Sequence, residues 1–143
     1  MKRFLIFSFL LAMVLPAFSQ QVTPETLMKR QKRKGLTVQE WNTPAGSKRP
    51  FLDHVTTYDS LGRKIEEIEY ASYGQKSRVV SEYANPTDPA SKVLREIEYN
   101  DRDKVVRIRK FEYNDDGTKK RQLNYYPNGK LESYKEFKFV FND

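Results

Sequence analysis

Few residues of this chain have the type and spacing that chemistry requires. Glu66, Glu67 and Glu69 form an acidic cluster, and a pair of carboxyl groups can hydrolyse a glycosidic bond. The 143 residues include one His, His54, and no Cys, so the sequence offers neither a thiol nucleophile nor a Cys/His metal site. Because Arg and Lys recur beside these Glu residues, ion pairs between neighbouring strands explain the cluster better. We therefore predict no catalytic residue, no cofactor and no metal, and interpret His54 as an ordinary strand residue.

A second group of residues is basic. It lies among aromatic residues, a composition that nucleic-acid-binding proteins use. Its members are Arg107, Arg109, Lys110, Lys119, Lys120 and Arg121. We nevertheless expect no nucleic-acid partner, because the N-terminus indicates export. Outside the cytoplasm, basic residues meet anionic lipid headgroups, acidic polysaccharide or acidic protein surfaces. The basic run 29–34 could do the same, although a solvated helix or arm explains it more simply.

The N-terminus has the pattern of a secretory signal peptide. Lys2-Arg3 precedes an apolar run from Phe4 to Leu15, and Ala17-Phe18-Ser19 follows, which matches the charged, apolar and small-residue regions of such a signal. We predict a signal peptide over 1–19. The apolar run is shorter than the ~20 residues of a membrane-spanning helix, so we expect no membrane span after cleavage. Without a Cys there is no lipoprotein anchor and no disulfide, and the predicted location is the bacterial periplasm or the exterior.

The next segment predicts a short helix. Thr23-Pro24-Glu25 combines a capping hydroxyl, a proline suited to the first helical turn and an acidic residue. Gly35 is a suitable end. Residues 20–35 are therefore expected to form a short helix or a flexible arm. The domain that follows, 36–143, begins with expected strands over 36–41 and 51–58.

A short phrase then repeats to the end of the chain: an apolar residue, a spacer, a Tyr and turn-forming residues. Its anchors, Tyr58, Tyr70, Tyr83, Tyr99, Tyr113 and Tyr125, lie 12 to 16 residues apart, which is one strand and one turn. Asn, Asp and Gly after the Tyr favour tight hairpins, and Asn85-Pro86 begins an enlarged loop. The predicted fold is mostly β: an antiparallel meander of seven or eight strands, open or curled, with a short N-terminal helix.

Strand periodicity predicts a register for the later repeats. If 100–103 and 114–117 loop out, opposite charges and apolar residues face each other. The expected pairs are Glu96 with Arg107, Ile97 with Val106, Glu112 with Lys119, and Ile108 with Leu123. This register leaves apolar residues on both faces of the sheet, so we expect the sheet to curl, to be covered by the N-terminal arm or to meet a partner.

The turn motifs resemble those of known repeat families. Tyr58-Asp59-Ser60-Leu61-Gly62-Arg63 resembles the Tyr-Asp repeat of RHS-type bacterial surface and toxin-shell proteins, and Tyr113-Asn114-Asp115-Asp116-Gly117 is a near copy. Tyr126-Pro127-Asn128-Gly129-Lys130-Leu131 is similar to the MORN-type hairpin repeat. The resemblance covers about residues 58–139 and implies hairpin-building rather than catalytic roles. RHS shells contain many more repeats, so their encapsulating role is not implied here.

The leading functional hypothesis is a non-enzymatic binding module of the bacterial cell envelope. Tyr and Arg are enriched at interface hot spots, and the predicted interaction face consists of Arg95, Tyr99, Arg109, Tyr113, Arg121 and Tyr125. The expected partner is an unidentified envelope protein, a glycan or an anionic surface. One alternative is a curled sheet that carries an apolar or glycan ligand. A third, less favoured, is an envelope hydrolase that uses Glu66, Glu67 and Glu69.

Overall fold

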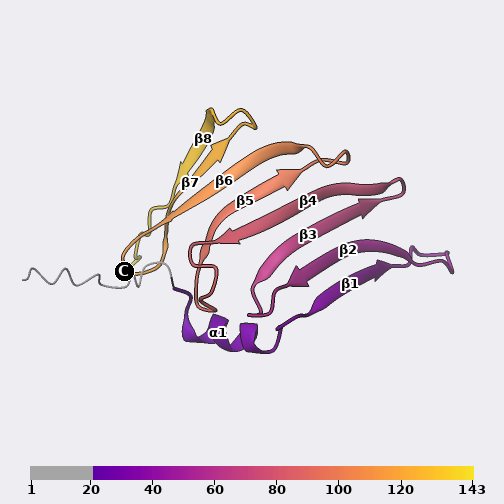
Figure 1. Ribbon diagram of the computed structural model, residues 1–143, viewed down its shortest axis with the longest axis horizontal. Helices are drawn as coiled ribbons and strands as arrows, with labels where there is room; N and C mark the ends of the chain where they lie inside the picture. The colour runs from indigo at the N-terminus through magenta and orange to yellow at the C-terminus, as the bar shows by residue number, and fades with distance from the viewer. Residues whose placement is uncertain (1–20) are drawn as a thin grey trace, which may run out of the picture.

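The computed structural model describes residues 21–143, which form one helix and one eight-stranded antiparallel sheet. The strands lie in the sheet in sequence order (Figure 1). The elements are α1 Pro24–Gln31, β1 Thr37–Asn42, β2 Phe51–Tyr58, β3 Lys64–Ala71, β4 Gly74–Tyr83, β5 Val93–Tyr99, β6 Val105–Tyr113, β7 Lys119–Tyr125 and β8 Leu131–Glu136. The predicted open meander with a short N-terminal helix is confirmed. The predicted signal peptide, 1–19, lies outside the described residues.

The segment before the sheet forms the expected helix. Thr23 caps α1, since its side-chain oxygen accepts a hydrogen bond from the Thr26 N–H at 3.3 Å, and Pro24 occupies the first turn. Gly35 follows the helix with a φ of 65°, and its N–H donates to the Asp59 carbonyl at 2.8 Å. As a result, α1 lies against the ends of the strands, near the β2–β3 turn and the β4–β5 loop (Figure 1).

Four of the hairpins share one turn. In the β2–β3 hairpin the Asp59 carbonyl accepts from the Gly62 N–H, and the Asp59 N–H donates to the Arg63 carbonyl. The same two bonds close the turns that begin at Asn100, Asn114 and Tyr126. The fourth residue of each turn has a positive φ, between 60° and 86°, and is Gly in three of them and Asp103 in the other. Three-residue hairpin loops use this left-handed position, so the Asn, Asp and Gly residues have the structural role predicted from the sequence.

A register shift accompanies each repeated Tyr. It lies immediately before the Tyr in the pairing of every strand pair from β2–β3 onward. In the β5–β6 pair, Tyr99 faces Val105 but Glu98 faces Arg107, so Val106 is an extra residue on β6. Such a β-bulge disturbs the ladder locally and increases the twist of the strands.

The three-residue turns and the bulges together make the predicted register wrong by two residues. Glu96 faces Arg109 rather than Arg107, and Ile97 faces Ile108 rather than Val106. In the next pair the differences are the same. Glu112 faces Arg121 rather than Lys119, Leu123 faces Lys110, and Ile108 faces Tyr125. One residue of the shift comes from the three-residue turn and one from the bulge. Because the side-chain period of a strand is two, each residue keeps its face.

The two faces of the sheet differ in chemistry. Directly opposed residues share a face, and two rows of them cross β4 to β8. One row is Ser81, Glu96, Arg109, Asn124 and Ser133, and its side is called here the polar face. The other row is Val80, Ile97, Ile108, Tyr125 and Leu131, and its side is called the aliphatic face. Apolar residues also lie on the polar face. Phe111 is two residues from Arg109 on β6 and therefore points to the same face. The predicted presence of apolar residues on both faces is confirmed.

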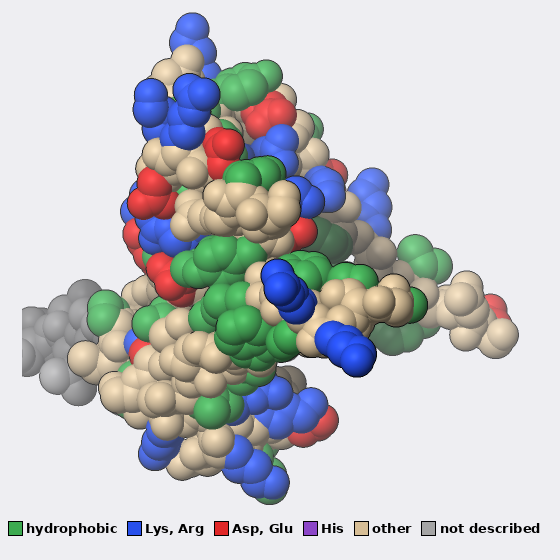
Figure 2. Space-filling model, turned by 90° about the vertical axis from the view of Figure 1, so that its right-hand side faces the viewer, with side chains coloured by type: hydrophobic (Ala, Val, Ile, Leu, Met, Phe, Trp, Pro, Cys, Tyr) green, Lys and Arg blue, Asp and Glu red, His purple; other side chains and the backbone are tan. Residues whose placement is uncertain are grey.

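The sheet is a single layer, so it has little conventional core. Phe111, 7% exposed, is the one buried hydrophobic side chain among residues 21–143. Small polar residues of the polar face, Thr56, Ser81 and Asn124, are as deeply buried. Figure 2 shows hydrophobic side chains at the surface in the middle of the view, with Lys and Arg above and below them. Exposed apolar side chains lie on both faces, among them Val38 on the polar face and Leu131 on the aliphatic face, 37% and 51% exposed. A second layer would normally cover such side chains.

Gly62 provides a test of the contact between α1 and the sheet. A Cβ at Gly62 would lie 1.8 Å from the Arg30 carbonyl oxygen, whereas a Cβ at Gly129 meets nothing within 4 Å. Both residues have left-handed backbones, with φ of 79° and 86°. Gly129→Ala is expected to cost roughly 1–2 kcal/mol of unfolding free energy from backbone strain alone. Gly62→Ala is expected to cost roughly 3 kcal/mol or more, because α1 must also move. Urea unfolding of the two variants measures the difference, and equal losses would contradict the contact.

Candidate functional site

Arg63, in the β2–β3 turn, is the most deeply buried charged residue among residues 21–143, and its surroundings form one corner of the molecule. Its side chain is 7% exposed. Asp59, four residues earlier in the same turn, pairs with it, since Arg63 Nε donates to Asp59 Oδ2 at 2.8 Å. The other carboxylate oxygen accepts from the backbone N–H groups of Leu61 and Arg63, both at 2.9 Å. Burial alone would raise the pKa of Asp59, but these hydrogen bonds and the Arg63 charge outweigh it and hold the pKa below its usual value.

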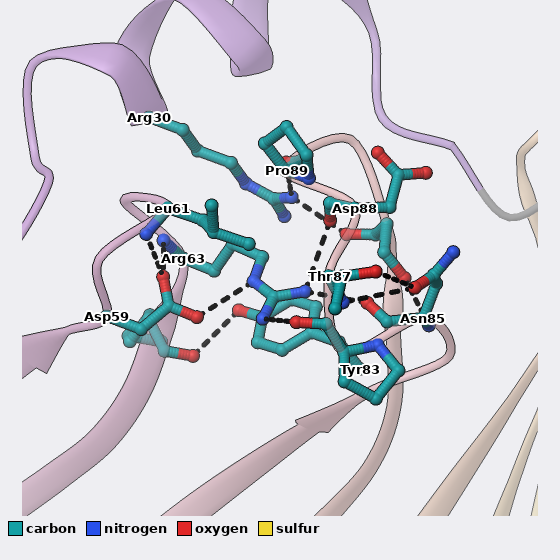
Figure 3. A network of polar contacts seen from close by, with 12 residues as sticks. Arg30, Asp59, Leu61, Arg63, Tyr83, Asn85, Thr87, Asp88 and Pro89 are labelled. Carbon is teal, nitrogen blue, oxygen red and sulfur yellow. Dashed lines mark hydrogen bonds and ion pairs between the residues drawn. The ribbon is translucent and has the colours of Figure 1, made fainter.

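The rest of the Arg63 guanidinium binds the β4–β5 loop. Its Nη1 donates to the carbonyls of Asn85 at 2.8 Å and Asp88 at 3.1 Å, and its Nη2 donates to the Pro86 carbonyl at 2.8 Å (Figure 3). The loop contains two prolines and cannot join a strand ladder. Because three of its carbonyls accept from one planar group, the position of the loop depends on Arg63.

Arg30 of α1 binds the same loop from the other side. Its Nη1 donates to the carbonyls of Pro89 and Ser91, each at 2.7 Å. The guanidinium carbons of Arg30 and Arg63 lie 5.3 Å and 4.5 Å from the centre of the Tyr83 ring. Tyr83 in turn donates its hydroxyl to the Lys64 carbonyl at 2.7 Å. Burial raises the pKa of Tyr83 to about 12, although the nearby Arg30 and Arg63 charges oppose the rise.

A hollow of about 260 Å³, called here the corner hollow, opens between α1 and the ends of β2, β3 and β4. Its charged lining residues are all cationic: Lys29, Arg30, Arg33 and Lys64. Thr26, Gly62, Tyr58 and Tyr83 complete the lining. The Arg33 guanidinium lies over the Tyr58 ring at 5.3 Å. The basic run 29–34, for which a solvated helix or arm was the simpler interpretation, thus contributes three of its residues to one concave surface.

The six residues of the predicted interaction face lie on two faces. Arg95, Tyr99, Arg121 and Tyr125 lie on the aliphatic face, whereas Arg109 and Tyr113 lie on the polar face. The structure therefore brings four of them together on one side of β5 and β7, with β6 between, and separates the other two from them.

All six residues have partners within the sheet. Arg95 pairs with Glu82, Arg121 with Glu112, and Arg109 with Glu96 and Glu98. Arg78 lies over the Tyr99 ring at 4.1 Å, and Lys110 lies over the Tyr125 ring at 5.2 Å. Tyr113 donates its hydroxyl to the Val93 carbonyl. These side chains cross-link neighbouring strands, which a single-layer sheet needs.

The acidic cluster is divided in a similar way. Glu66 pairs with Arg78 on the aliphatic face, whereas Glu67 and Glu69 lie on the polar face and pair with Lys64 and Lys76. His54 contacts Glu40 of β1, with its Nδ1 2.7 Å from a carboxylate oxygen. Within residues 21–143, no group of three or more His, Asp or Glu side chains is arranged to hold a metal ion. The described helix, α1, is not long and apolar enough to cross a membrane.

Sequence reasoning did not single out the C-terminal edge of the sheet. Every residue of β8 is exposed. Leu131 and Tyr134 lie on the aliphatic face opposite Tyr125 and Leu123, and these four residues are called here the β8 surface. Beyond the strand, Phe137, Phe139 and Phe141 are exposed as well. The alternation of Phe from 137 to 141 was the signal in the sequence that could have identified this edge.

Comparison with known proteins adds no family to this description. No protein-family model matches the chain, and no curated protein matches it significantly. The resemblance to RHS-type and MORN-type repeats stays a prediction.

The Asp59–Arg63 pair gives a stability prediction. Asp59→Asn is expected to lower the unfolding free energy by roughly 3 kcal/mol, because it leaves a buried guanidinium without its counter-charge. Glu112→Gln is the matched control, since Glu112 and Arg121 are each 39% exposed and the loss should be about 0–1 kcal/mol. Because the folded-state pKa of Asp59 is lowered, its contribution is complete above its unfolded pKa of about 4 and is lost as pH falls through the folded value. Urea unfolding at neutral and acidic pH tests both points; a pH-independent difference between wild type and Asp59→Asn would contradict the pairing.

The buried tyrosines give a prediction at alkaline pH. Burial raises the pKa of Tyr83 and of Tyr113 to about 12 each. In the unfolded chain both ionise near pH 10, so between about pH 10 and 12 the folded state retains protons that the unfolded state releases, and stability falls as pH rises. Tyrosinate absorbance should show a late phase that Tyr83→Phe and Tyr113→Phe each reduce. Tyr73→Phe, at a residue 68% exposed, is the control for the loss of an exposed tyrosine. A late phase unchanged in both buried-site variants would refute this assignment.

Proposed function

We propose that the mature chain is a non-enzymatic binding module of the bacterial cell envelope, and that it binds a partner protein through the β8 surface. The observation that carries the proposal is the uncovered single-layer sheet. A sheet normally buries one face against another layer, and here both faces and the last strand remain exposed. Contiguous exposed apolar surface of this kind is typical of interaction sites.

The β8 surface combines two features that favour a protein partner. Leu131 and Tyr134 are 51% and 56% exposed and lie beside Tyr125 and Leu123 of β7. The outer edge of β8 also presents backbone N–H and C=O groups, since β8 is the last strand in the sheet order. An extended segment of a partner can add to such an edge, where backbone hydrogen bonds provide affinity and side-chain contacts provide specificity.

The charged residues support a binding role rather than a reaction. Arg109, Arg121, Glu66 and Glu69 form cross-strand ion pairs, and Glu67 pairs with Lys64 of its own strand. In this arrangement the charges strengthen strand pairing. Of the predicted interaction face, Tyr125 belongs to the β8 surface, and Arg121 of β7 lies opposite Glu136 of β8. Both residues are included in the proposed interface.

The envelope location rests on the N-terminal sequence. Lys2-Arg3, the apolar run from Phe4 to Leu15 and Ala17-Phe18-Ser19 match a cleavable signal peptide. We propose that the mature chain begins at Gln20 and acts in the periplasm or outside the cell.

Site-specific photo-crosslinking tests this function. A photoreactive phenylalanine derivative is placed at Tyr134 or, as a control, at Tyr73, an exposed aromatic of the β3–β4 hairpin. After incubation of residues 20–143 with envelope extract, we expect a discrete protein adduct from position 134 and none from 73. Tyr134→Ser should reduce capture about tenfold or more, because truncating an aromatic anchor in an interface costs ~2 kcal/mol or more, whereas Tyr73→Ser should not.

Two outcomes would contradict the proposal. Identical adducts from positions 134 and 73 would show non-specific adhesion, and the absence of any adduct in the envelope extract would remove the basis for a protein-binding role at this edge.

A further inference from the structure

The corner hollow has the composition of an anion-binding site. Two cationic side chains, Lys29 and Arg30, come from α1, Arg33 comes from the turn after the helix, and Lys64 comes from the start of β3. Among residues 21–143, no carboxylate lines the hollow. The partial negative charge at the C-terminal end of an eight-residue helix accounts for one or two basic residues near it. It does not account for a cation contributed by the sheet to the same surface.

We propose that the corner hollow binds a single sugar that carries a phosphate or carboxylate group. The hollow is separate from the β8 surface, because it is formed by α1, β2, β3 and β4. The proposal therefore stands without the proposed function.

Arg30 provides a fixed donor at the wall of the hollow. Only 9% of its surface is exposed, and its Nη1 is held by the Pro89 and Ser91 carbonyls. Within residues 21–143, its Nε and Nη2 donate no hydrogen bond to protein atoms. Burial is the largest influence on Arg30 and lowers the pKa of its guanidinium. A negative charge in the hollow would therefore stabilise its charged form, and a planar guanidinium matches the oxygens of phosphate and carboxylate.

The other cations are available to a ligand. Arg33 contacts the Tyr58 ring and has no carboxylate partner among residues 21–143. Lys29 pairs with Glu25 at 3.3 Å, but both side chains are more than half exposed, and such pairs contribute little. The nearby Asp59 carboxylate is already bound by Arg63 and two backbone N–H groups, so it does not neutralise the hollow.

The size and the remaining lining favour a sugar over a longer ligand. At about 260 Å³ the hollow is below the ~300–1,000 Å³ of sites for drug-sized molecules. Thr26 contributes a hydroxyl, and Tyr58 contributes both a hydroxyl and an aromatic ring. Hydroxyl groups and ring carbons of a sugar match this mixed lining, and its anionic group matches the cations.

Isothermal titration of residues 20–143 with four small molecules tests the proposal. Glucose 6-phosphate and glucuronate should bind, with an affinity that falls as salt is raised. Glucose should not bind detectably, and inorganic phosphate should bind more weakly than glucose 6-phosphate. Arg33→Gln should weaken binding of both anionic sugars about tenfold, the effect of losing one charge-assisted hydrogen bond.

The control is Lys110→Gln. Lys110 also lies over a tyrosine ring, that of Tyr125, but on β6, outside the hollow. This variant should bind as the wild type does. Urea unfolding should show that both variants remain folded, since the Arg33 side chain contacts only the Tyr58 ring among the interactions described.

Three results would overturn the proposal. Equal affinity for inorganic phosphate and glucose 6-phosphate would reject the sugar. Equal weakening by Arg33→Gln and Lys110→Gln would reject the hollow as the site. No binding of either anionic sugar at low salt would reject the site altogether.

Discussion

The buried Arg63 guanidinium is the constraint on which one half of the structure depends. A charge that is removed from water must be compensated by a counter-charge and hydrogen bonds, and Arg63 obtains both from Asp59 and from three carbonyls of the β4–β5 loop. The loop positioned in this way then supplies the carbonyls that accept from Arg30. The position of α1, and with it the corner hollow, thus depends on a polar network rather than on an apolar core.

The same dependence on polar contacts explains why the repeated phrase does not form a single binding face. Each Tyr lies at or next to the end of a strand, beside a bulge, and successive strands run in opposite directions. Tyr99 and Tyr125 consequently lie on the aliphatic face at one end of the strands, whereas Tyr83 and Tyr113 lie on the polar face at the other. At both ends a cation from a neighbouring segment covers the ring. The Tyr residues of the phrase therefore stabilise an open sheet through contacts on both of its faces.

Local features of the fold were predictable from the sequence because they depend on local chemistry. The cap at Thr23, the strand Phe51–Tyr58 and the turns ending in Gly62, Gly117 and Gly129 follow from residues within a few positions of one another. The register was not predictable by counting, because a three-residue turn and a bulge each add one residue. The Arg63 network could not be predicted from the sequence for another reason. Its partners at Asn85, Pro86 and Asp88 are backbone carbonyls, which carry no sequence signal, although the Arg of the Tyr-Asp-x-x-Gly-Arg motif marked one end of it.

The strands β2 to β5 and the hairpin of β7 and β8 differ in the contacts that hold them beyond their ladders. The strands β2 to β5 are joined beyond their ladders by Arg63, Tyr83 and the contacts of α1. The hairpin of β7 and β8 has no such cap among the described residues, and β8 is exposed along its whole length. Segments with few buried contacts open most readily, so an exposed edge strand such as β8 would gain order if another chain paired with its edge. A partner bound there would supply the covering layer that the polar network supplies at the opposite corner.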